Sequence, residues 1–599
     1  MDVEIVLVSK RLDCVITSLP FMEYYLPPAA PAVLKGHLES KGFTVRTLDF
    51  NITVKETFDL AVQNHKKNNL QAAEKLYKQI LEIEPDHIES IFYLGSLSMQ
   101  IGNFDRAKQL LNKTIQIDPS HAQAYNNLGA IAFQKLKKNQ EAISYYEKAI
   151  QINPNFTQAL NNLGIALNAF GEYKKAIKFY QKAIQINPNF TNAHTNLGAS
   201  FHEIGEYKKA ISAYEKAIEI NPNFSSAHLN LGVVFEDLGD YRKAISCYEK
   251  ALKLNPDAVN AQANISNICI AQLDNLEKAI SESNKTLKIH NKTFKFINQK
   301  IPLYRLKHDV QQAEYLSSKN YKINGIDKFQ KVGSEILARE ENEKDNSNFN
   351  KKILLNQNEI ESLLPFYKAN HVYQTSKISG SCINPDKNWK DVEEQYLNSP
   401  KQIIYIDNFL SEEAVKELRE FCLVSKVWHR EYEHKYLGSF SDRGFVSPVH
   451  LQIAIDLKEK LPKLFGQHNL GKFWAFKYDS TLGKGINIHA DFALINLNFW
   501  ITPDEYNNEK NAGGLKVYDT PAPEDWTYEQ YNIRTDKIYK FLYDSSAKCT
   551  NIPYKFNRAV LFNSAYFHET DKINFKDVYE ARRINITYLF GNRTVKKKH

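Results

Sequence analysis

Residues 193–224 read AHTNLGASFHEIGEYKKAISAYEKAIEINPNF, and variants of this stretch recur along much of the chain. A proline ends all but the last copy, and successive prolines are 34 or 35 residues apart: Pro85, Pro119, Pro154, Pro188, Pro222 and Pro256. Within the quoted copy, Gly198 and Ala210 occupy positions where two helices must pack closely, and Pro222 ends the second helix. A fixed period of this length is typical of stacked repeats that bury a common core.

The form of the repeat is the tetratricopeptide pattern, in which each unit is a pair of helices. We count seven repeats within residues 53–292; the first lacks the central glycine, and the last, ending near Asn291, lacks the proline and resembles a cap. Such an array is expected to form an α-superhelix with a concave face that binds an extended partner. The repeats therefore predict a protein or peptide partner.

One asparagine recurs at the same position in successive repeats: Asn127, Asn162, Asn196, Asn230 and Asn264. By the family geometry this position lies on the first helix of each pair, toward the concave surface. An amide donates and accepts at once, so a ladder of amides can pair with the backbone of an extended peptide. The O-linked N-acetylglucosamine transferase has a similar ladder that grips peptide backbone. Alternatively, asparagine is only the consensus residue of duplicated repeats and helps the array to hold its shape.

Three residues near the C-terminal end indicate a different chemistry. His489 and Asp491 lie in NIHADF, and His568 lies in FNSAYFHET. Residues i and i+2 of a strand point to the same side, so His489 and Asp491 can converge on one ion. Two histidines and one carboxylate form the ligand set that holds Fe(II) on one face and leaves the other face open. A chance His-x-Asp is expected about once in a chain of this size, so the pair alone is a weak signal.

The segment EARRINITYLFG strengthens the iron hypothesis. It places Arg583, Asn585 and Thr587 on one face of a predicted strand, and Arg582 on the other. An inward arginine can clamp a carboxylate through two parallel hydrogen bonds. Iron ligands followed by a carboxylate-binding arginine are what an oxidation coupled to a 2-oxo acid requires.

Residues 401–594 resemble the Fe(II)/2-oxoglutarate-dependent oxygenases of the prolyl-hydroxylase-like type. The motifs QIIYIDNFLSEEAVKELREFC, FKYDSTLGKGINIHAD, GGLKVYD, AVLFNSAYFHET and RRINITYLF follow in the family order. The resemblance implies a multidomain α and β protein in which the repeats precede a double-stranded β-helix, or jelly roll. It also implies that the iron ligands are His489, Asp491 and His568.

The resemblance further implies where 2-oxoglutarate binds. Arg583 would bind the distal carboxylate of this co-substrate, with Arg582 as the rival arginine. Tyr478 and Asn585 would lie beside the co-substrate. The implied reaction is an oxidative decarboxylation that releases succinate and CO₂ and oxidises a C–H bond of the substrate.

The other segments carry weaker signals. Residues 1–52 predict one βαβ unit that resembles the start of a cobalamin-binding domain but lacks its cobalamin-ligating histidine motif. Residues 293–400 contain short helices and the polar stretch LAREENEKDNSNFNKK, which predicts a flexible linker. Residues 595–599 form a basic tail.

Composition limits the class of protein. The chain has 599 residues, of which 43% are hydrophobic and 24% charged, with a formal net charge of +8, which predicts several soluble domains. Six scattered cysteines without a CxxC pair favour a reducing compartment. With no signal peptide and no apolar run of about 18 residues, we expect a cytoplasmic protein without a membrane association. Since no basic stripe is interleaved with aromatic residues, no nucleic-acid partner is expected.

The leading hypothesis is a dioxygenase that uses Fe(II), O₂ and 2-oxoglutarate to hydroxylate a protein or peptide recruited by the repeat groove. The first alternative is a 2-oxoglutarate oxygenase that acts on a small molecule and uses its repeats for assembly. The second alternative is a non-enzymatic protein-binding scaffold with a decayed barrel. Deletion of residues 54–292 is the obvious test between the first two.

Overall fold

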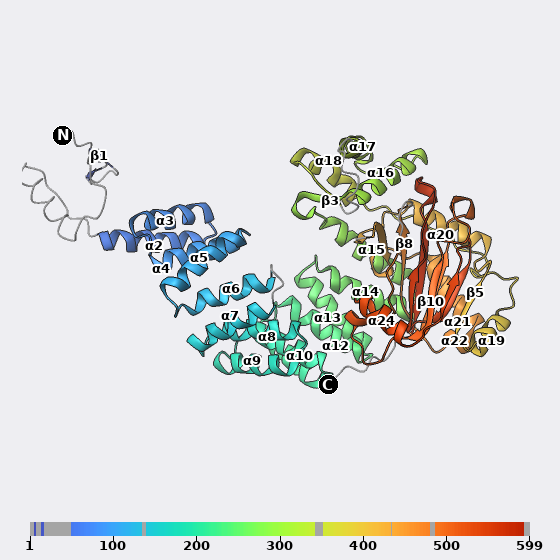
Figure 1. Cartoon of the computed structure of the whole chain (residues 1–599), viewed down its shortest axis with the longest axis horizontal. Helices are drawn as coiled ribbons and strands as arrows, with labels where there is room; N and C mark the ends of the chain where they lie inside the picture. The colour runs from blue at the N-terminus through green and yellow to red at the C-terminus, as the bar shows by residue number, and fades with distance from the viewer. Residues whose placement is uncertain are drawn as a thin grey trace, which may run out of the picture. The chain divides into compact units, whose positions relative to one another are not determined.

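The computed structural model describes residues 5–7, 14–16, 50–134, 139–341, 351–432, 434–479 and 485–591. The chain divides into two compact units, residues 1–196 and 197–599. Figure 1 shows paired helices from α2 to α15, followed by further helices and a β-rich region.

Seven helix pairs make up the repeats. The first helices are α2 (Phe50–Lys66), α4 (Ile88–Gln100), α6 (Ala122–Gln134), α8 (Thr157–Ala169), α10 (Thr191–Glu203), α12 (Ser225–Asp237) and α14 (Val259–Gln272). The second helices are α3 (Leu70–Ile83), α5 (Phe104–Ile117), α7 (Asn139–Ile152), α9 (Tyr173–Ile186), α11 (Tyr207–Ile220), α13 (Tyr241–Leu254) and α15 (Leu276–Lys292). The seven predicted repeats are present, although α2 begins before the predicted boundary at residue 53.

Within a repeat, the central glycine makes room for an aromatic ring. A Cβ added to Gly164 would lie 2.5 Å from the ring of Tyr180, and one added to Gly198 would lie 2.8 Å from Tyr214. Ala210, from the second helix of that same pair, is fully buried. The predicted close packing of the paired helices at Gly198 and Ala210 is therefore confirmed.

Replacing Gly164 with alanine should lower the free energy of unfolding by about 1–3 kcal/mol, because the new methyl group displaces the Tyr180 ring. Urea unfolding followed by circular dichroism measures this loss. Gly95→Ala in α4 is the matched control, since its Cβ would meet the flexible Leu111 side chain at 3.2 Å. Helix propensity favours alanine by about 1 kcal/mol at both sites. Equal losses at Gly95 and Gly164 would contradict the packing argument.

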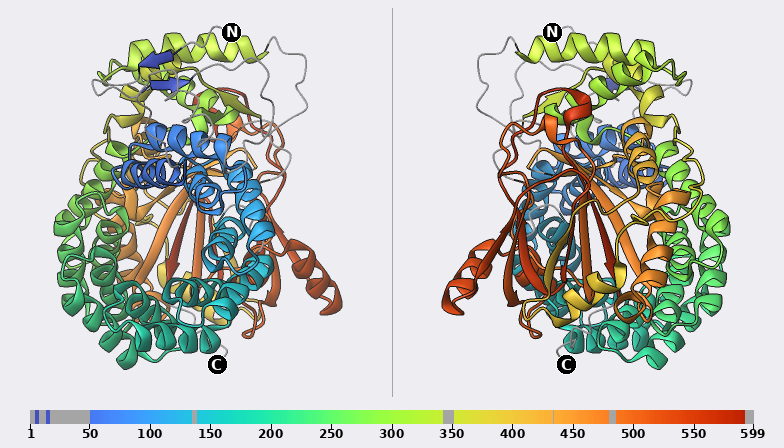
Figure 2. Two further views of the ribbon diagram at one scale, coloured as in Figure 1. Left: turned by 90° about the vertical axis from the view of Figure 1, so that its left-hand side faces the viewer. Right: turned by 90° about the vertical axis from the view of Figure 1, so that its right-hand side faces the viewer.

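The larger sheet has seven strands, and each pairs antiparallel with its neighbours (Figure 2). Their order is β5 (Ile403–Ile406), β12 (Ala559–Asn563), β9 (Ile495–Trp500), β14 (Ile584–Phe590), β8 (Leu470–Tyr478), β7 (Tyr436–Phe440) and β6 (Arg430–Tyr432). A smaller antiparallel sheet has the order β11 (Cys549–Ile552), β10 (Leu515–Pro521) and β13 (Tyr566–Thr570).

The two sheets pack face to face. Trp474 and Phe476 of β8 share one hydrophobic core with Leu515 and Val517 of β10. Alternate residues of β8 and β14 turn to the opposite face, where they join a core built largely from helices. The region that follows the repeats is therefore β-rich, with two facing antiparallel sheets, and its jelly-roll topology stays a prediction.

Further helices surround these sheets. They are α16 (Leu303–Ser318), α17 (Ile326–Glu341), α18 (Gln357–Lys368), α19 (Trp389–Asn398), α20 (Glu412–Val424), α21 (Pro448–Lys460), α22 (Pro462–Phe465), α23 (Tyr528–Asn532) and α24 (Thr535–Asp544). A short strand pair, β3 (Lys300–Pro302) and β4 (Lys352–Leu354), lies among the first of them. None of the described helices combines the length and apolar character needed to cross a membrane.

The last repeat is part of the core of the β-rich region. Ser283 of α15 donates from Oγ to the carbonyl of Ser441 at 2.6 Å and accepts from the N–H of Gly444 at 2.8 Å. Leu287 packs against Gly444 so closely that an added Cβ would lie 2.6 Å from it. Helix α14 contacts β8 directly (Figure 1). The predicted boundary at residue 292 therefore does not separate two independent folding units.

The predicted linker is folded wherever residues 293–400 are described. Phe329 of α17 and Phe366 of α18 stack with ring centroids 4.1 Å apart. Gln312 of α16 donates to the backbone carbonyls of Leu423 and Ser425 at 3.3 and 3.1 Å. The short helices predicted around the polar stretch are present, and their apolar faces share a core with the end of α20. The flexible linker predicted for the polar stretch itself stays a prediction, because most of that stretch is not described. Residues 342–350 lie outside the described residues.

The N-terminal segment is described only at two short strands. β1 (Ile5–Leu7) pairs antiparallel with β2 (Cys14–Ile16). The strands of a βαβ unit run parallel, so this pair is not the predicted arrangement. Residues 17–49, which hold the predicted helix and second strand, lie outside the described residues, as does the basic tail at 595–599.

Candidate metal centre

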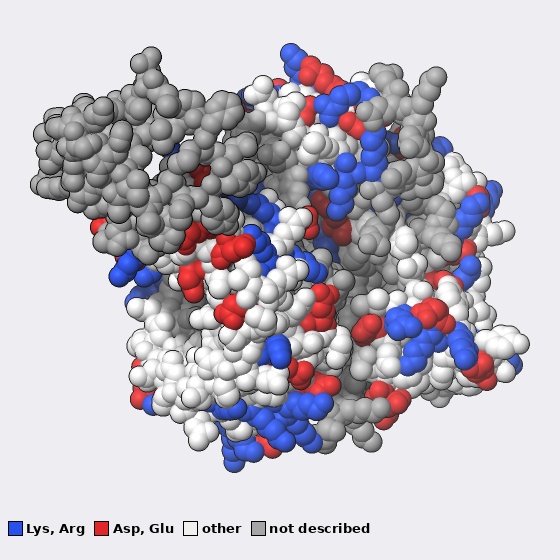
Figure 3. Space-filling view, turned by 60° about the vertical axis from the view of Figure 1, so that its left-hand side comes forward, with Lys and Arg blue, Asp and Glu red and all other residues white. Residues whose placement is uncertain are grey.

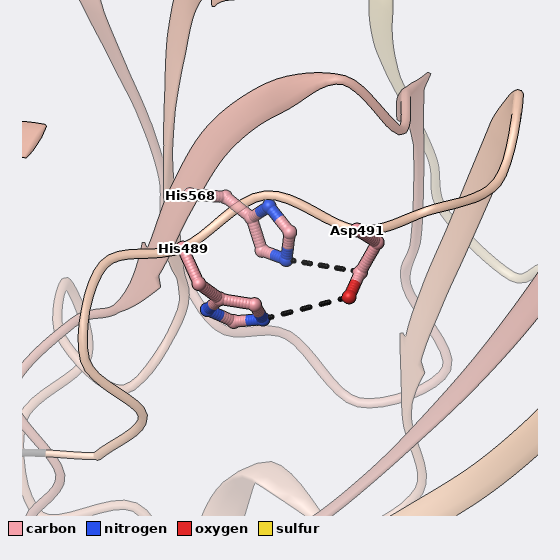
Figure 4. A group of neighbouring side chains, drawn as sticks. All are labelled: His489, Asp491 and His568. Carbon is pink, nitrogen blue, oxygen red and sulfur yellow. Dashed lines mark ion pairs between the residues drawn. The ribbon is translucent and has the colours of Figure 1, made fainter. Parts of the chain in front are cut away.

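The three predicted iron ligands converge in space (Figure 4). His489 forms a β-bridge with His568 of β13, and their backbone N–H groups donate to each other's carbonyls at 3.0 and 2.8 Å. Asp491 is held two residues further on, where its N–H donates to the carbonyl of Ser564 at 3.1 Å. One ligand atom from each of the three side chains lies within 4.8 Å of the other two.

Hydrogen bonds on the far side of each ring select the nitrogen that faces the cluster. His489 Nδ1 lies 2.8 Å from the carbonyl of Asn487, and His568 Nδ1 lies 3.0 Å from that of Tyr566. A carbonyl only accepts, so each Nδ1 carries the proton and each Nε2 keeps a free lone pair. These Nε2 atoms lie 3.8 and 3.5 Å from the two oxygens of Asp491. Metal-binding histidines are oriented in this way.

Burial affects the protonation of two candidate ligands in opposite ways. It favours the neutral His568 ring that a metal needs and opposes the ionised Asp491 carboxylate that a metal also needs. Desolvation, helped by the neighbouring His489, lowers the pKa of His568 well below its usual value, so the ring is neutral. Desolvation also raises the pKa of the Asp491 carboxyl, while His489 and the Asn496 amide offset part of that shift. A buried carboxylate is costly without a compensating positive charge. A divalent cation between the three side chains would supply that charge.

The three ligands line a pocket between the sheets. Its other walls come from Trp474, Phe476, Ile486, Asn498, Leu515, Thr570, Arg583, Asn585 and Thr587. Its lining combines four apolar side chains with eight polar or charged ones, the three candidate ligands included.

Arg583 brings a buried positive charge to this pocket. The side chain is 1% exposed, and its Nε donates to the carbonyl of Gly513 at 2.6 Å. Its Nη2 lies 3.4 Å from the carbonyl of Gly514, whereas Nη1 has no hydrogen-bond partner of regular geometry among the described residues. A buried guanidinium with an unsatisfied N–H group points to an anionic partner.

Aromatic rings surround the Arg583 guanidinium. Its Cζ lies 4.9 Å from the ring centroid of Tyr478, 5.6 Å from that of Trp500 and 5.9 Å from that of Tyr554. Within the described part of the chain, Trp500 Nε1 is likewise buried without a regular hydrogen-bond partner, whereas Tyr478 Oη interacts with Arg583 and Thr570 outside regular geometry. The unsatisfied Trp500 donor beside the arginine favours a ligand that offers acceptors. The sequence analysis missed Trp500 and Tyr554; the only signal was that Trp500 ends an apolar strand.

Arg582, the rival arginine, faces away from the pocket. Its Nη2 and Nε lie 2.8 and 3.1 Å from Oε1 of Gln311 in α16, and its Nη1 lies 3.7 Å from Asp479. The alternation expected for a strand thus places Arg583, and not Arg582, on the pocket side. Asn585 also lies in the pocket wall, but its Nδ2 donates to Asn498 and Thr587.

Models of known families match the repeats. Models described as tetratricopeptide repeats match residues 65–131, 120–189, 179–212 and 225–258, and one described as a TPR repeat matches 198–239. Residues 65–258 belong to the tetratricopeptide-repeat family. The matched residues account for about a third of the chain.

Several solved structures are similar to part of the chain. They include MamA (30% identity, TM-score 0.25), YrrB, a TPR protein with an unusual peptide-binding site (24%, 0.27), and pilF of Pseudomonas aeruginosa (18%, 0.33). They cover 28%, 31% and 35% of this chain and 93%, 95% and 96% of their own chains. No curated protein matches the chain.

Three amides of the asparagine ladder link neighbouring repeats of the tetratricopeptide array. The links run from Asn127 Nδ2 to Ser96 Oγ (3.1 Å), from Asn162 Nδ2 to Asn126 Oδ1 (2.9 Å) and from Asn196 Nδ2 to Asn161 Oδ1 (2.9 Å). This geometry favours the interpretation that the ladder helps the array to hold its shape. Asn230 and Asn264 are half-buried on α12 and α14, and peptide binding by the ladder stays a prediction.

Replacing Asn162 and Asn196 together with alanine should lower the free energy of unfolding by about 1–3 kcal/mol for each acceptor left unpaired. The acceptors are Asn126 and Asn161, both buried. Urea unfolding measures the loss, and Asn155→Ala in an exposed turn is the control. Unchanged stability together with weaker peptide capture would restore the peptide-binding interpretation.

Proposed function

We propose that the protein is an Fe(II)- and 2-oxoglutarate-dependent dioxygenase that hydroxylates a protein or peptide recruited by its tetratricopeptide array. One observation carries the proposal. The His489–Asp491–His568 cluster and the buried, incompletely paired Arg583 line the same pocket. A metal site and an anion site in one pocket suit a dicarboxylate that spans them.

The donor set fits iron. His489, Asp491 and His568 would hold Fe(II), whose chemistry when bound is the oxidation of a C–H bond with O₂. The set consists of two imidazole nitrogens and one carboxylate oxygen. These three ligands would occupy one face of the metal and leave the other positions open for a co-substrate. The Nδ1 hydrogen bonds of both histidines hold the rings in the binding tautomer.

Arg583 would select the co-substrate. Its guanidinium presents donors in a rigid fork, which matches a carboxylate better than a single ammonium does. Tyr478 and Trp500 would add hydrogen bonds from the same side. The apolar walls, among them Ile486 and Leu515, would pack on the methylene groups of 2-oxoglutarate and exclude water from the reacting end.

The array supports a macromolecular substrate. Tetratricopeptide arrays present extended surfaces that bind other proteins or peptides, and residues 65–258 belong to that family. On the face drawn in Figure 3, both basic and acidic side chains are present among the described residues.

Succinate release tests the proposal. Purified protein with Fe(II) and 2-oxoglutarate under air should release succinate, and a chelator or the exclusion of O₂ should stop the release. Binding of 2-oxoglutarate to Co(II)-loaded protein, measured by calorimetry, covers an enzyme that turns over only with its substrate. If the protein neither binds 2-oxoglutarate nor releases succinate, that result contradicts the proposal and favours the scaffold.

The small-molecule alternative needs a narrower deletion than the one spanning 54–292. That deletion would remove α14 and α15, whose residues pack in the core of the β-rich region. Removal of residues 54–190 leaves helices α10 to α15 in place. If the repeats recruit the substrate, this variant should lose turnover of the protein substrate but keep 2-oxoglutarate binding. Undiminished turnover would favour the small-molecule alternative.

A further inference from the structure

A chain of buried hydrogen bonds runs from β14 across β9 to one of the proposed iron ligands. Its members are Asp491, Asn496, Asn498, Asn585 and Thr587, none more than 6% exposed. Asn496 and Asn498 are alternate residues of β9, and Asn585 and Thr587 are alternate residues of β14. Because the two strands pair, Thr587 stands opposite Asn498 in the register.

The distances show a continuous chain. Asn496 Nδ2 donates to Asp491 Oδ2 at 2.6 Å, and Asn498 Nδ2 donates to Asn496 Oδ1 at 2.5 Å. Asn498 Oδ1 then accepts from Thr587 Oγ1 at 2.6 Å and from Asn585 Nδ2 at 3.0 Å. Asn496 and Asn498 therefore each use the amide oxygen on one side and the amide nitrogen on the other.

The chain has a direction. Thr587 Oγ1 also accepts from Asn585 Nδ2 at 3.2 Å, so its own proton is directed to Asn498. With its oxygen occupied, Asn498 can only offer N–H to Asn496, and Asn496 in turn can only offer N–H to Asp491. Every donor thus points toward the carboxylate, which suits an ionised group that only accepts.

We infer that Asn496 and Asn498 are positioning residues for the metal ligand Asp491, an inference that rests on the proposed function. Asn496 holds Oδ2 of the carboxylate. Among the described residues, Oδ1 accepts no hydrogen bond and lies 3.8 Å from His489 Nε2, whereas Oδ2 already accepts from Asn496 and lies 3.5 Å from His568 Nε2. The chain therefore fixes the rotation of the carboxylate and leaves Oδ1 for the metal, as outer contacts of metal ligands do.

The neutral amides suit this role. A lysine at the position of Asn496 would also donate to Asp491, but its positive charge would oppose a cation at the site. An amide orients the carboxylate without changing the charge that the metal meets. Asn496 makes the direct hydrogen bond to Asp491. Asn498 acts on Asp491 only by holding the Asn496 amide.

Calorimetric titration of the full-length protein with Co(II) tests the inference. Asn496→Leu and Asn498→Leu should each weaken Co(II) binding by about 10–100-fold, the usual effect of losing an outer contact to a ligand. Thr587→Val should weaken binding several-fold, whereas Thr587→Ser, which keeps the hydroxyl, should bind as the unchanged protein does. The control is Thr502→Val. The buried Thr502 hydroxyl donates to the carbonyl of Arg582 and takes no part in the chain of hydrogen bonds to Asp491.

The outcomes separate the inference from the proposed function. Normal Co(II) affinity in both leucine variants, with no binding by His489→Ala, overturns the positioning role and leaves the proposed function standing. Absence of Co(II) binding by the unchanged protein overturns both. The thermal midpoint without metal reports folding, and a Thr502→Val variant that loses Co(II) affinity equally shows a general effect of stability and overturns the positioning role. Thr587→Val and Thr587→Ser change too little side-chain volume to unfold the protein. Equal Co(II) affinities of these two variants would also overturn the positioning role.

Discussion

His489→Ala should abolish metal binding and succinate release while the helical circular dichroism of the array persists. The substitution removes one of three ligand atoms, so its effect on Co(II) affinity should exceed the roughly 100-fold upper range for outer contacts. The backbone bridge between His489 and His568 does not depend on the side chain, so the fold of the pocket should survive. Calorimetry with Co(II) and Fe(II)-dependent succinate release measure the two losses.

His468→Ala is the control for the His489 variant. His468 is a partly exposed histidine of the same region and is not part of the cluster. It should bind Co(II) with the affinity of the unchanged protein. Iron-dependent turnover retained by His489→Ala would remove this residue from the ligand set.

Arg583→Met should raise the 2-oxoglutarate concentration for half-maximal succinate release by about 10–100-fold or more. Hydrogen bonds to a charged group contribute about 1.5–3 kcal/mol each, and the variant loses the guanidinium fork that makes them. Methionine keeps much of the volume between the surrounding rings. Succinate release at increasing 2-oxoglutarate, together with calorimetric binding, measures the change.

Arg582→Met is the matched control for the Arg583 variant. Arg582 binds Gln311 on the far side of the strand, so this variant should lose stability but keep its apparent KM for 2-oxoglutarate. The reverse result, with the larger rise in KM at Arg582, would show that the other arginine binds the co-substrate. Equal, small changes at both positions would argue against 2-oxoglutarate as the ligand.

Features set by local periodicity could be predicted from the sequence. The repeat period placed Gly198 where the two helices of a repeat pack closely, because these helices are close in sequence; that the neighbour is the Tyr214 ring was not predicted. Strand alternation placed Arg583 and Asn585 on one face and Arg582 on the other, since successive side chains of a strand point to opposite sides. The same rule predicted that His489 and Asp491 converge, and they do, although the predicted strand is absent there: only His489 forms a β-bridge, and β9 begins at Ile495.

Features that depend on distant partners could not be predicted. Ser283 meets Ser441 and Gly444 across more than a quarter of the chain, and no local pattern marks such a contact. The polar stretch near residue 340 gave no sign that the apolar faces of α17 and α18 pack against each other in the folded chain. The recurring asparagines of the ladder look the same in the sequence whether their amides bind a peptide or the preceding repeat.

The contact between α15 and Gly444 has a mechanical consequence. Helix α14 rests on β8, and β8 pairs with β14, the strand that begins beside Arg583. The N–H of Tyr478, at the end of β8, donates to the carbonyl of Arg583 at 3.0 Å. A partner that bends or twists the last helix pair would therefore load a strand joined by a hydrogen bond to the anion-binding arginine. The last helix pair and the pocket thus share one sheet.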